Sequence, residues 1–499
     1  MRKVLFTILA VLLVSCTGQI PSRFSQETSK PDITPDYRDI IYPSNMAPAN
    51  FRIDNEGSRF VTIFTAGSRK TILKGRVTDM PLRKWRKLQA EGGTVNVEIF
   101  VRNGKDWNRY QPFTITLAEP IDQYMAYRMI PPLDEYYEEI FINQRDLTTF
   151  KESTVYSNAM VHNGSIGQCI NCHHFRNYST DNMQFHARQY KGGTVMIFNG
   201  DLRIVNLKTD STLSAGVYPA WHPTHDYIAY STNITKQAMH LSDPNRVEVR
   251  DLASDLILYD INDNSVSIIE NDSCQFECFP AWSPDGLTLF YVSAAVEEDY
   301  NKETPRIMKT DFKAFHYDLY AKPFNPETRE WGPSRKIFDA AAINRSATMP
   351  RVSPDGRYLM FSMGEYGVFH IWHRDADLYL MDLFTGQVRE MNEVNSDDVE
   401  SYHSWSSNGR WIVFSSRRDD GAFTRLYLSH FDTDGKFSKP FALPLRKPEY
   451  VENLMKSYNI PEFITEPVKV SPRRFARFIS RNTAESVSYA PKKELPTTP

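Results

Sequence analysis

The residues with the most specific chemistry in this sequence form the run Gln168-Cys169-Ile170-Asn171-Cys172-His173-His174. The run contains C-x-x-C-H, the pattern by which a c-type haem is attached to protein. Each of the two thiols adds to one haem vinyl group, and the following histidine supplies a nitrogen to the iron. We therefore predict one covalent haem c, held by Cys169, Cys172 and His173.

The C-x-x-C pair by itself is not specific for haem. It also occurs in disulfides, in thioredoxin-like redox motifs and in zinc sites, although no βαβ pattern surrounds it here. A six-coordinate haem needs a second axial ligand, and the nearby candidates are Met183, His186 and His162. His174 directly follows the proximal His173 and is too constrained to reach the opposite face of a haem.

The composition and the N-terminus indicate an exported globular protein. Its net charge of −3 argues against nucleic acid as a partner. Arg2 and Lys3 precede an apolar run from Val4 to Val14, as in a signal peptide. The run ends in Leu13-Val14-Ser15-Cys16, which resembles a bacterial lipoprotein box. That resemblance implies cleavage before Cys16, lipid attachment to its sulfur and an outer-membrane location on the periplasmic face; an ordinary signal peptide is the alternative.

Two further cysteines remain, Cys274 and Cys278. In an exported protein these two cysteines could form a disulfide; the alternative is that both are small buried residues. A zinc site that combines them with Cys169 and Cys172 is disfavoured, because the two pairs lie about a hundred residues apart, against 15–20 in a zinc ribbon.

Repeats determine the predicted fold. Four blocks of the type Pro-Ala-Trp-Ser-Pro-Asp-Gly, each followed by an apolar strand, begin at Pro219, Pro280, Pro350 and His403. A second strand-like element follows each block at 255–260, 317–320, 377–382 and 425–428, and 200–206 is a fifth copy. Two strands, a loop and two more strands make one blade of a β-propeller. The fold class is therefore all-β, with five visible blades.

These blocks resemble the propeller repeats of TolB-like proteins, and residues 120–465 resemble an exported Bacteroidota family of TolB-like propellers that carry a cytochrome c-type motif. The resemblance implies six blades, with the sixth built from 435–470 or from the segment before 190. It also implies that the block Phe185-His186-Ala187-Arg188 recurs in the family, which favours His186 as the second iron ligand. The alternative is that His186 is a polar residue on the first propeller strand.

The rest of the chain is divided around this propeller. We expect the following order: a signal peptide (1–15), the lipidated Cys16 with a flexible tether (16–45), a β-sandwich-like domain (46–130), a partly helical haem-attachment segment (131–185), the propeller (186–470) and a disordered tail (471–499). Long connections at 232–254, 294–315 and 363–376 emerge on one face of a propeller and suggest a binding surface. It would carry His240, Glu297, Glu298, Asp299, His370, Trp372 and His373.

Three functions follow from these patterns. The first is a haem-binding or electron-transfer lipoprotein whose propeller docks a redox partner or an envelope protein. The second is a TolB-like interaction scaffold without haem, in which the cysteine pair is structural. The third is a propeller enzyme that acts on glycan or peptide through the long-loop face, although no hydrolase motif is visible. A metal site at His370 and His373 is disfavoured, because residues three apart on a strand face opposite ways.

Overall fold

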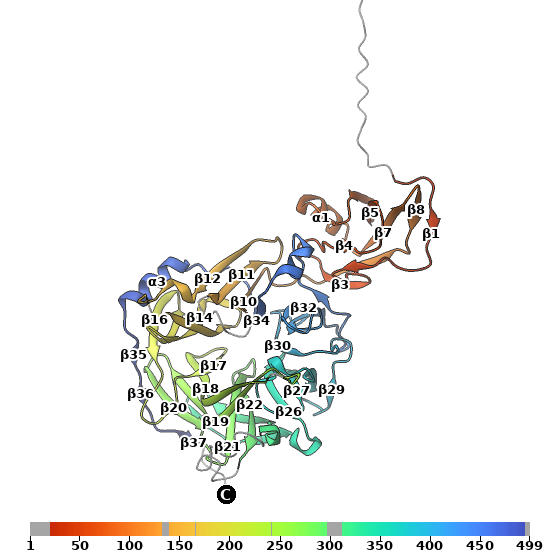
Figure 1. Ribbon diagram of the computed structural model, residues 1–499. Helices are drawn as coiled ribbons and strands as arrows, with labels where there is room; N and C mark the ends of the chain where they lie inside the picture. The colour runs from red at the N-terminus through yellow and green to blue at the C-terminus, as the bar shows by residue number, and fades with distance from the viewer. Residues whose placement is uncertain (1–19, 132–138, 165, 241, 297–311, 495–499) are drawn as a thin grey trace, which may run out of the picture.

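Six sheets, each built mainly of antiparallel strands, surround a central channel and form a six-bladed β-propeller (Figure 1). This computed structural model describes residues 20–131, 139–164, 166–240, 242–296 and 312–494. The innermost strands of successive blades contact one another in a closed cycle, β13–β17–β21–β26–β30–β34. The prediction of an all-β propeller is confirmed, and the number of blades is six.

The first three blades each gain an extra strand from the C-terminal tail. Blade 1 contains β13 (Gln168–Arg176), β14 (Ser179–Gln189), β15 (Gly193–Phe198), β16 (Asp201–Asn206) and β35 (Glu485–Ser486). Blade 2 contains β17 (Val217–Trp221), β18 (Tyr227–Met239), β19 (Val247–Asp260), β20 (Ser265–Glu270) and β36 (Ser488–Tyr489). Blade 3 contains β21 (Gln275–Trp282), β22 (Thr288–Ala295), β23 (Asp318–Asn325), β24 (Glu330–Trp331), β25 (Arg335–Phe338) and β37 (Lys493–Glu494).

The last three blades have four strands each. Blade 4 contains β26 (Ser346–Val352), β27 (Tyr358–Gly364), β28 (Asp377–Asp382) and β29 (Val388–Glu390). Blade 5 contains β30 (Glu400–Trp405), β31 (Trp411–Ser416), β32 (Arg425–His430) and β33 (Phe441–Ala442). Blade 6 contains β34 (Ser457–Ile464), β10 (Tyr124–Ile130), β11 (Phe141–Asp146) and β12 (Glu152–Ser157). Short 3-10 turns lie at η3 (Asn158–Met160), η4 (Phe312–Ala314), η5 (Ala341–Ile343), η6 (His370–Trp372) and η7 (Pro448–Asn453).

Blade 6 closes the ring. Its innermost strand β34 comes from the end of the propeller sequence, while β10, β11 and β12 come from the beginning. Both suggested sources of the sixth blade therefore contribute to it. Joining the two ends of the propeller in one sheet removes the free edges that an open ring would leave.

The Asp-Gly and Asn-Gly pairs of the repeats form tight turns between the first two strands of a blade. In blade 3 the Asp285 carboxylate accepts a hydrogen bond from the Leu287 backbone N–H at 3.0 Å, and Gly286 has a φ of 74°. A Cβ at Gly286 would lie 2.3 Å from the His222 ring of the neighbouring blade. The turn therefore requires glycine for both its backbone angle and its close approach.

Three expected segments differ from the structure. Residues 139–185 do not form a separate, partly helical segment: most of them lie in strands of blades 6 and 1, because the C-x-x-C-H run is itself a blade repeat. Residues 20–45 are not a free tether, since β1, β2 and β3 belong to the N-terminal domain. The tail is not disordered over 471–494. The signal peptide and Cys16 lie outside the described residues.

The tail begins with a helix and continues as a strap. Helix α3 (Pro472–Arg481) starts at Ser471, whose side chain accepts a hydrogen bond from the Arg474 backbone N–H, and it buries Phe475 and Ile479 against blades 6 and 1. Strands β35, β36 and β37 then pair in parallel with the outer strands of blades 1, 2 and 3. We call residues 482–494 the strap.

A chain that ends after Arg481 should keep its propeller and lose only the strap. Each strap strand is two residues long and exposed, so we expect a loss of about 1–2 kcal/mol in unfolding free energy. Hydrogen exchange should accelerate along β16, β20 and β24, whose outer edges lose their partners. Exchange along β29, which no strap strand covers, is the internal control. Unchanged exchange along β20 would contradict the pairing.

The N-terminal domain is one branched sheet with a helix. Its elements are β1 (Ser25–Gln26), β2 (Ile33–Thr34), β3 (Ile40–Pro43), β4 (Arg52–Ile53), β5 (Arg59–Ala66), β6 (Arg69–Lys74), α1 (Leu82–Gln89), β7 (Thr94–Asn103), β8 (Asp106–Arg109) and β9 (Phe113–Ala118). The long strand β7 pairs with β5 on one side and with β8 and β9 on the other, while β2 and β4 form a separate pair. Neither helix in the described part of the chain has the length and apolar character needed to cross a membrane.

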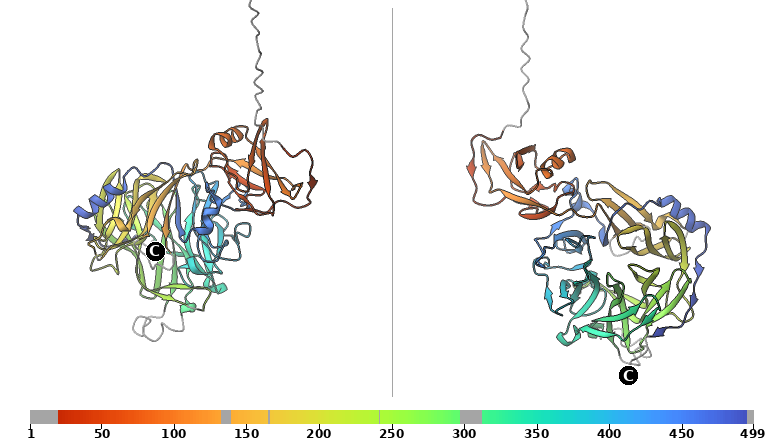
Figure 2. Two further views of the ribbon diagram at one scale, coloured as in Figure 1. Left: turned by 45° about the horizontal axis from the view of Figure 1, so that its top comes forward. Right: turned by 180° about the vertical axis from the view of Figure 1, so that it is seen from behind.

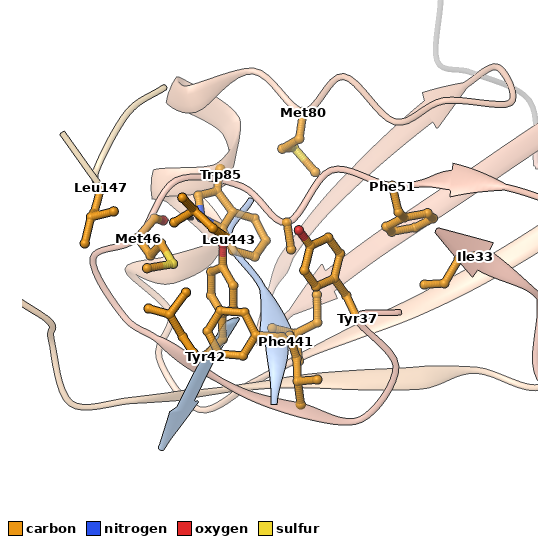
Figure 3. Close-up of a cluster of buried hydrophobic side chains, with 14 of the residues drawn as sticks. Ile33, Tyr37, Tyr42, Met46, Phe51, Met80, Trp85, Leu147, Phe441 and Leu443 are labelled. Atoms are coloured by element: carbon orange, nitrogen blue, oxygen red, sulfur yellow. Dashed lines mark hydrogen bonds between the residues drawn. The ribbon is translucent and has the colours of Figure 1, made fainter. Parts of the chain in front are cut away.

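This domain packs on blades 5 and 6 through a shared hydrophobic core (Figure 3). The Tyr42 ring lies 5.0 Å from the Phe441 ring of β33, and the Trp85 indole N–H donates to the Met46 carbonyl at 2.9 Å. The two further views show the domain on one side of the propeller, away from blades 2 and 3 (Figure 2). The propeller channel is therefore not covered by this domain.

Candidate functional site

A ring of six strained residues narrows the propeller channel. Each innermost strand contains one non-glycine residue with a positive φ, and the ladder register shifts at the same place in every blade. These residues are Cys172 (53°), Tyr218 (48°), Phe279 (51°), Met349 (55°), Tyr402 (40°) and Ile460 (48°). We call them the bulge ring. Left-handed backbone is unfavourable for side chains of this size, and such strain gathers at functional positions.

The C-x-x-C-H motif is the blade 1 copy of this bulge. The residue after the bulge is proline in four blades, at Pro219, Pro280, Pro350 and Pro461, and it is histidine in the other two, at His173 and His403. Cys172 is thus the blade 1 member of the bulge ring, and its side chain borders the channel. The motif lies on an extended strand at the propeller axis.

A cavity of about 750 Å³ lies where the innermost strands begin. Cys169 and Cys172 both line it, and both are free thiols. The long β18–β19 hairpin and the segment before Arg374 contribute to its wall, so two of the long connections singled out in the sequence do border it. The apolar lining includes Ile130, Ile140, Val217, Tyr218, Val247, Val249, Phe369, Ile371, Trp372, Tyr402, Phe423 and Ile460. Beyond the bulge ring the channel holds only about 30 Å³, so the cavity is nearly closed at its floor.

The cavity is electropositive. Arg128, Arg188 and Arg246 line it, and no described aspartate or glutamate does. None of the three arginines forms an ion pair with a carboxylate of the described residues. Burial raises the pKa of the Cys172 thiol, although the Tyr218 backbone, Arg188 and Arg128 oppose this effect. The thiol therefore stays protonated at neutral pH.

His173 lies beside the floor of the cavity. It borders the narrow space within the bulge ring, is only 1% exposed, and neither ring nitrogen has a well-aligned hydrogen-bond partner among the described residues. Burial, followed by the charge of Arg128, lowers the pKa of His173 to about 3, and the backbone of Ile460 partly opposes this shift. The imidazole is therefore neutral, which is the form that binds metals.

The two candidates for the second iron ligand differ in position. His186 lines the cavity, and its Nδ1 lies 3.3 Å from the Thr194 hydroxyl. Burial, followed by Arg188, lowers the pKa of His186 to about 3. Met183 lies fully buried in the hydrophobic core of blade 1 and does not reach the cavity, so the structure does not support it as a ligand. His162 is exposed and does not line the cavity.

Ionisable groups also gather where the innermost strands end. His174, Arg351 and Glu462 border a separate opening there, and His174 Nε2 lies 3.8 Å from the Glu462 carboxylate. Burial raises the pKa of Glu462 to about 8, although the charge of Arg351 opposes this shift. Burial lowers the pKa of His174 to about 3. At neutral pH this pair is therefore held without charge.

Replacing Glu462 with glutamine should stabilise the protein in alkaline solution. The folded-state pKa of about 8 lies above the ordinary 4.5, so wild type loses stability through this group as pH rises from 4.5 to 8. Glu462→Gln does not ionise, and above pH 8 we expect it to exceed wild type by roughly 2–4 kcal/mol in urea unfolding, with the gap closing below pH 5. Glu56→Gln, at an exposed position, is the control. A pH-independent gap would contradict the expectation.

Several other predicted site residues have structural roles. His370 Nε2 lies 3.1 Å from the Tyr366 and Gly367 carbonyls, and His373 Nε2 lies 3.1 Å from the Glu248 carboxylate; both rings are fully buried. Cys274 and Cys278 are free thiols rather than a disulfide. His240 lies outside the cavity and stacks on Phe312, while Glu297, Glu298 and Asp299 lie outside the described residues. No group of three or more His, Cys, Asp or Glu among the described residues is arranged to hold a metal ion.

No pattern in the sequence singles out the arginines of the cavity. Arg128, Arg188 and Arg246 come from blade 6, blade 1 and the β18–β19 hairpin, and only the closure of the ring brings them together. One signal was available for the bulge ring: Asn171-Cys172-His173-His174-Phe175 aligns with Ser401-Tyr402-His403-Ser404-Trp405 of blade 5.

Comparisons with solved structures find matches at low sequence identity and TM-scores below 0.5. No protein-family model matches the chain, and no curated protein does. TolB from Acinetobacter baumannii is 14% identical, with 77% of this chain and 85% of that chain covered and a TM-score of 0.43. A hypothetical selenium-binding protein from Sulfolobus tokodaii is 9% identical over 74% of this chain and 97% of its own, with a TM-score of 0.41. A Synechocystis apocarotenoid oxygenase mutant is 11% identical over 85% of this chain and 95% of its own, with a TM-score of 0.36. The propeller assignment rests on the six sheets themselves.

Proposed function

We propose that this protein carries one c-type haem in the cavity above the bulge ring, attached through Cys169 and Cys172. The observation that carries the proposal is that both thiols line one cavity of about 750 Å³. That volume lies within the range of about 300–1,000 Å³ that is usual for cofactor and ligand sites. Each attachment adds a thiol S–H across one vinyl double bond, with sulfur on one carbon and hydrogen on the other, and releases no leaving group.

The walls of the cavity suit a flat aromatic group with two acidic arms. Aromatic side chains from three parts of the fold line it, including Tyr218, Trp372 and Tyr402. Arginine binds carboxylates in a two-pronged geometry, and Arg128, Arg188 and Arg246 have no carboxylate partner among the described residues. The two propionates of haem would supply such partners.

The chain also offers iron ligands in the required chemical form. His173 is neutral, buried and without a well-aligned hydrogen bond, so its nitrogens lack the partner that a buried polar group normally has. His186 lines the cavity together with Cys169 and Cys172 and would be the second ligand, whereas His173 borders the narrow space at the floor of that cavity. In the proposed state His173 would hold the iron from the motif side, as the C-x-x-C-H pattern implies.

Electron transfer is the function that such a group supplies, because haem iron takes up and gives back one electron. The chain would bury the haem, keep water from it and set its potential through the arginines and axial ligands. The propeller would dock the redox partner. We include in the proposal that the chain is exported and anchored through Cys16 on the periplasmic face of the outer membrane, which rests on the sequence pattern of residues 2–16.

A pyridine haemochrome spectrum tests the proposal. The protein is purified from cells that export it and possess an active haem-attachment pathway, and is then extracted with acidified acetone. A c-type band that stays with the protein is the expected result. If no band remains while other c-type cytochromes in the same cells mature, the proposal fails and the thiol pair has a structural or disulfide role.

A further inference from the structure

A second charged surface lies on the N-terminal domain, far from the haem cavity. The segment Ile20–Ser25 and strands β5, β6, β7 and β8 form an open groove. Six cationic side chains line it: Arg23, Arg59, Lys74, Arg76, Arg102 and Lys105. Asp106 is the acidic residue of that lining. The groove is therefore strongly cationic in a chain whose net charge is −3.

The cations of this groove are not neutralised within the protein. None of the six forms an ion pair with a carboxylate of the described residues, although many other arginines and lysines of this chain do. Arg59 lies directly opposite Arg102 in the β5–β7 ladder, and like charges in such a pair destabilise a sheet. Arg102 Nε is also buried without a hydrogen bond. An external anion between Arg59 and Arg102 would relieve this unfavourable pair.

The groove lies close to the proposed lipid anchor. Ile20 lines it, and Cys16 precedes Ile20 by four residues, so the groove stays within about 15 Å of a lipid on Cys16. Ile20 is 38% exposed and Phe24 is 42% exposed, which leaves apolar groups at its rim. Strands β1 and β8 lie on the side of the domain that is turned away from the propeller (Figure 1).

We propose that this groove docks on the membrane surface and binds the phosphates of anionic phospholipid headgroups. The orientation of the groove towards the membrane rests on the proposed lipid attachment at Cys16, whereas the positive charge of the groove is independent of that attachment. Cationic side chains beside a lipid anchor add electrostatic attraction to anionic headgroups. Docking through this face would leave the propeller cavity free for a partner.

Sedimentation with lipid vesicles tests the proposal. The chain from position 16 onward with Cys16→Ser carries no lipid, so this assay does not depend on lipidation, and its outcome is independent of haem. We expect binding to vesicles that contain phosphatidylglycerol, weak binding to pure phosphatidylcholine, and loss of binding as salt is raised. The triple variant Arg59→Gln/Lys74→Gln/Lys105→Gln should weaken binding at least about tenfold.

The matched control removes the same number of charges elsewhere. Arg473, Arg474 and Arg477 are exposed on α3, and their replacement with glutamine should leave vesicle binding unchanged within about twofold. Equal weakening by both triple variants would overturn the proposal, because it would show a response to net charge alone. The absence of binding to phosphatidylglycerol vesicles at low salt would also overturn it. A failed haemochrome test would leave this result unaffected.

Discussion

Replacing both Cys169 and Cys172 with serine is expected to abolish covalent haem in the purified protein. In the proposed site the two thiols would supply both thioether bonds, and the double variant leaves the cavity with no thiol that can add to a vinyl group. Each single variant keeps one bond, so a haemochrome band should remain but move towards that of haem with one free vinyl group. Spectra after acid–acetone extraction measure all three variants against wild type.

The chain contains a matched control for this experiment. Cys274 is a free thiol on blade 3 that does not line the cavity, and Cys274→Ser should leave the haem content unchanged. Folding is checked by circular dichroism, because serine differs from cysteine by one atom and should cost little at these positions. Covalent haem in the double variant would show that attachment uses other residues, and it would contradict the proposed site.

The first five blades can be predicted from the sequence because the main strands of each one come from one continuous stretch of chain. The Asp-Gly turns at Gly286 and Gly356 and the apolar strands after them are encoded in one short run, so fold and blade identity can be predicted from it. The sixth blade is harder to predict. Its four strands come from two segments about three hundred residues apart, 124–157 and 457–464, and only the closed ring pairs them.

The candidate site was only partly predictable for the same reason. Cys169, Cys172 and His186 form a local pattern, and all three line the cavity. The sequence predicts a partly helical haem-attachment segment over 131–185, whereas the C-x-x-C-H motif lies on strand β13 of blade 1. The strap could not be predicted, since its two-residue strands show no alternation. The cationic groove depends on the register that places Arg59 opposite Arg102.

Removing the indole of Trp411 is expected to cause the largest loss of stability among single substitutions outside the cavity. Trp411 is fully buried in the core that joins blade 5 to the N-terminal domain, and its N–H donates to the Glu119 carbonyl at 3.1 Å. Replacing a buried tryptophan with alanine typically costs about 3–5 kcal/mol, through lost transfer energy and the cavity left behind. Urea unfolding of Trp411→Ala should show a loss of this size.

The control is Phe384→Ala, whose side chain is 80% exposed on blade 4 and should change the unfolding free energy by less than about 0.5 kcal/mol. Because the Trp411 core spans the two units, the variant should also expose the connection near Glu119 to protease, while wild type resists cleavage there. A loss below about 1 kcal/mol in Trp411→Ala would mean that the N-terminal domain and the propeller are joined mainly by their polar contacts, such as the Tyr37 hydroxyl on the Ala442 carbonyl. Trp411 does not line the cavity proposed to hold haem, so haem content in this variant should follow the amount of folded propeller.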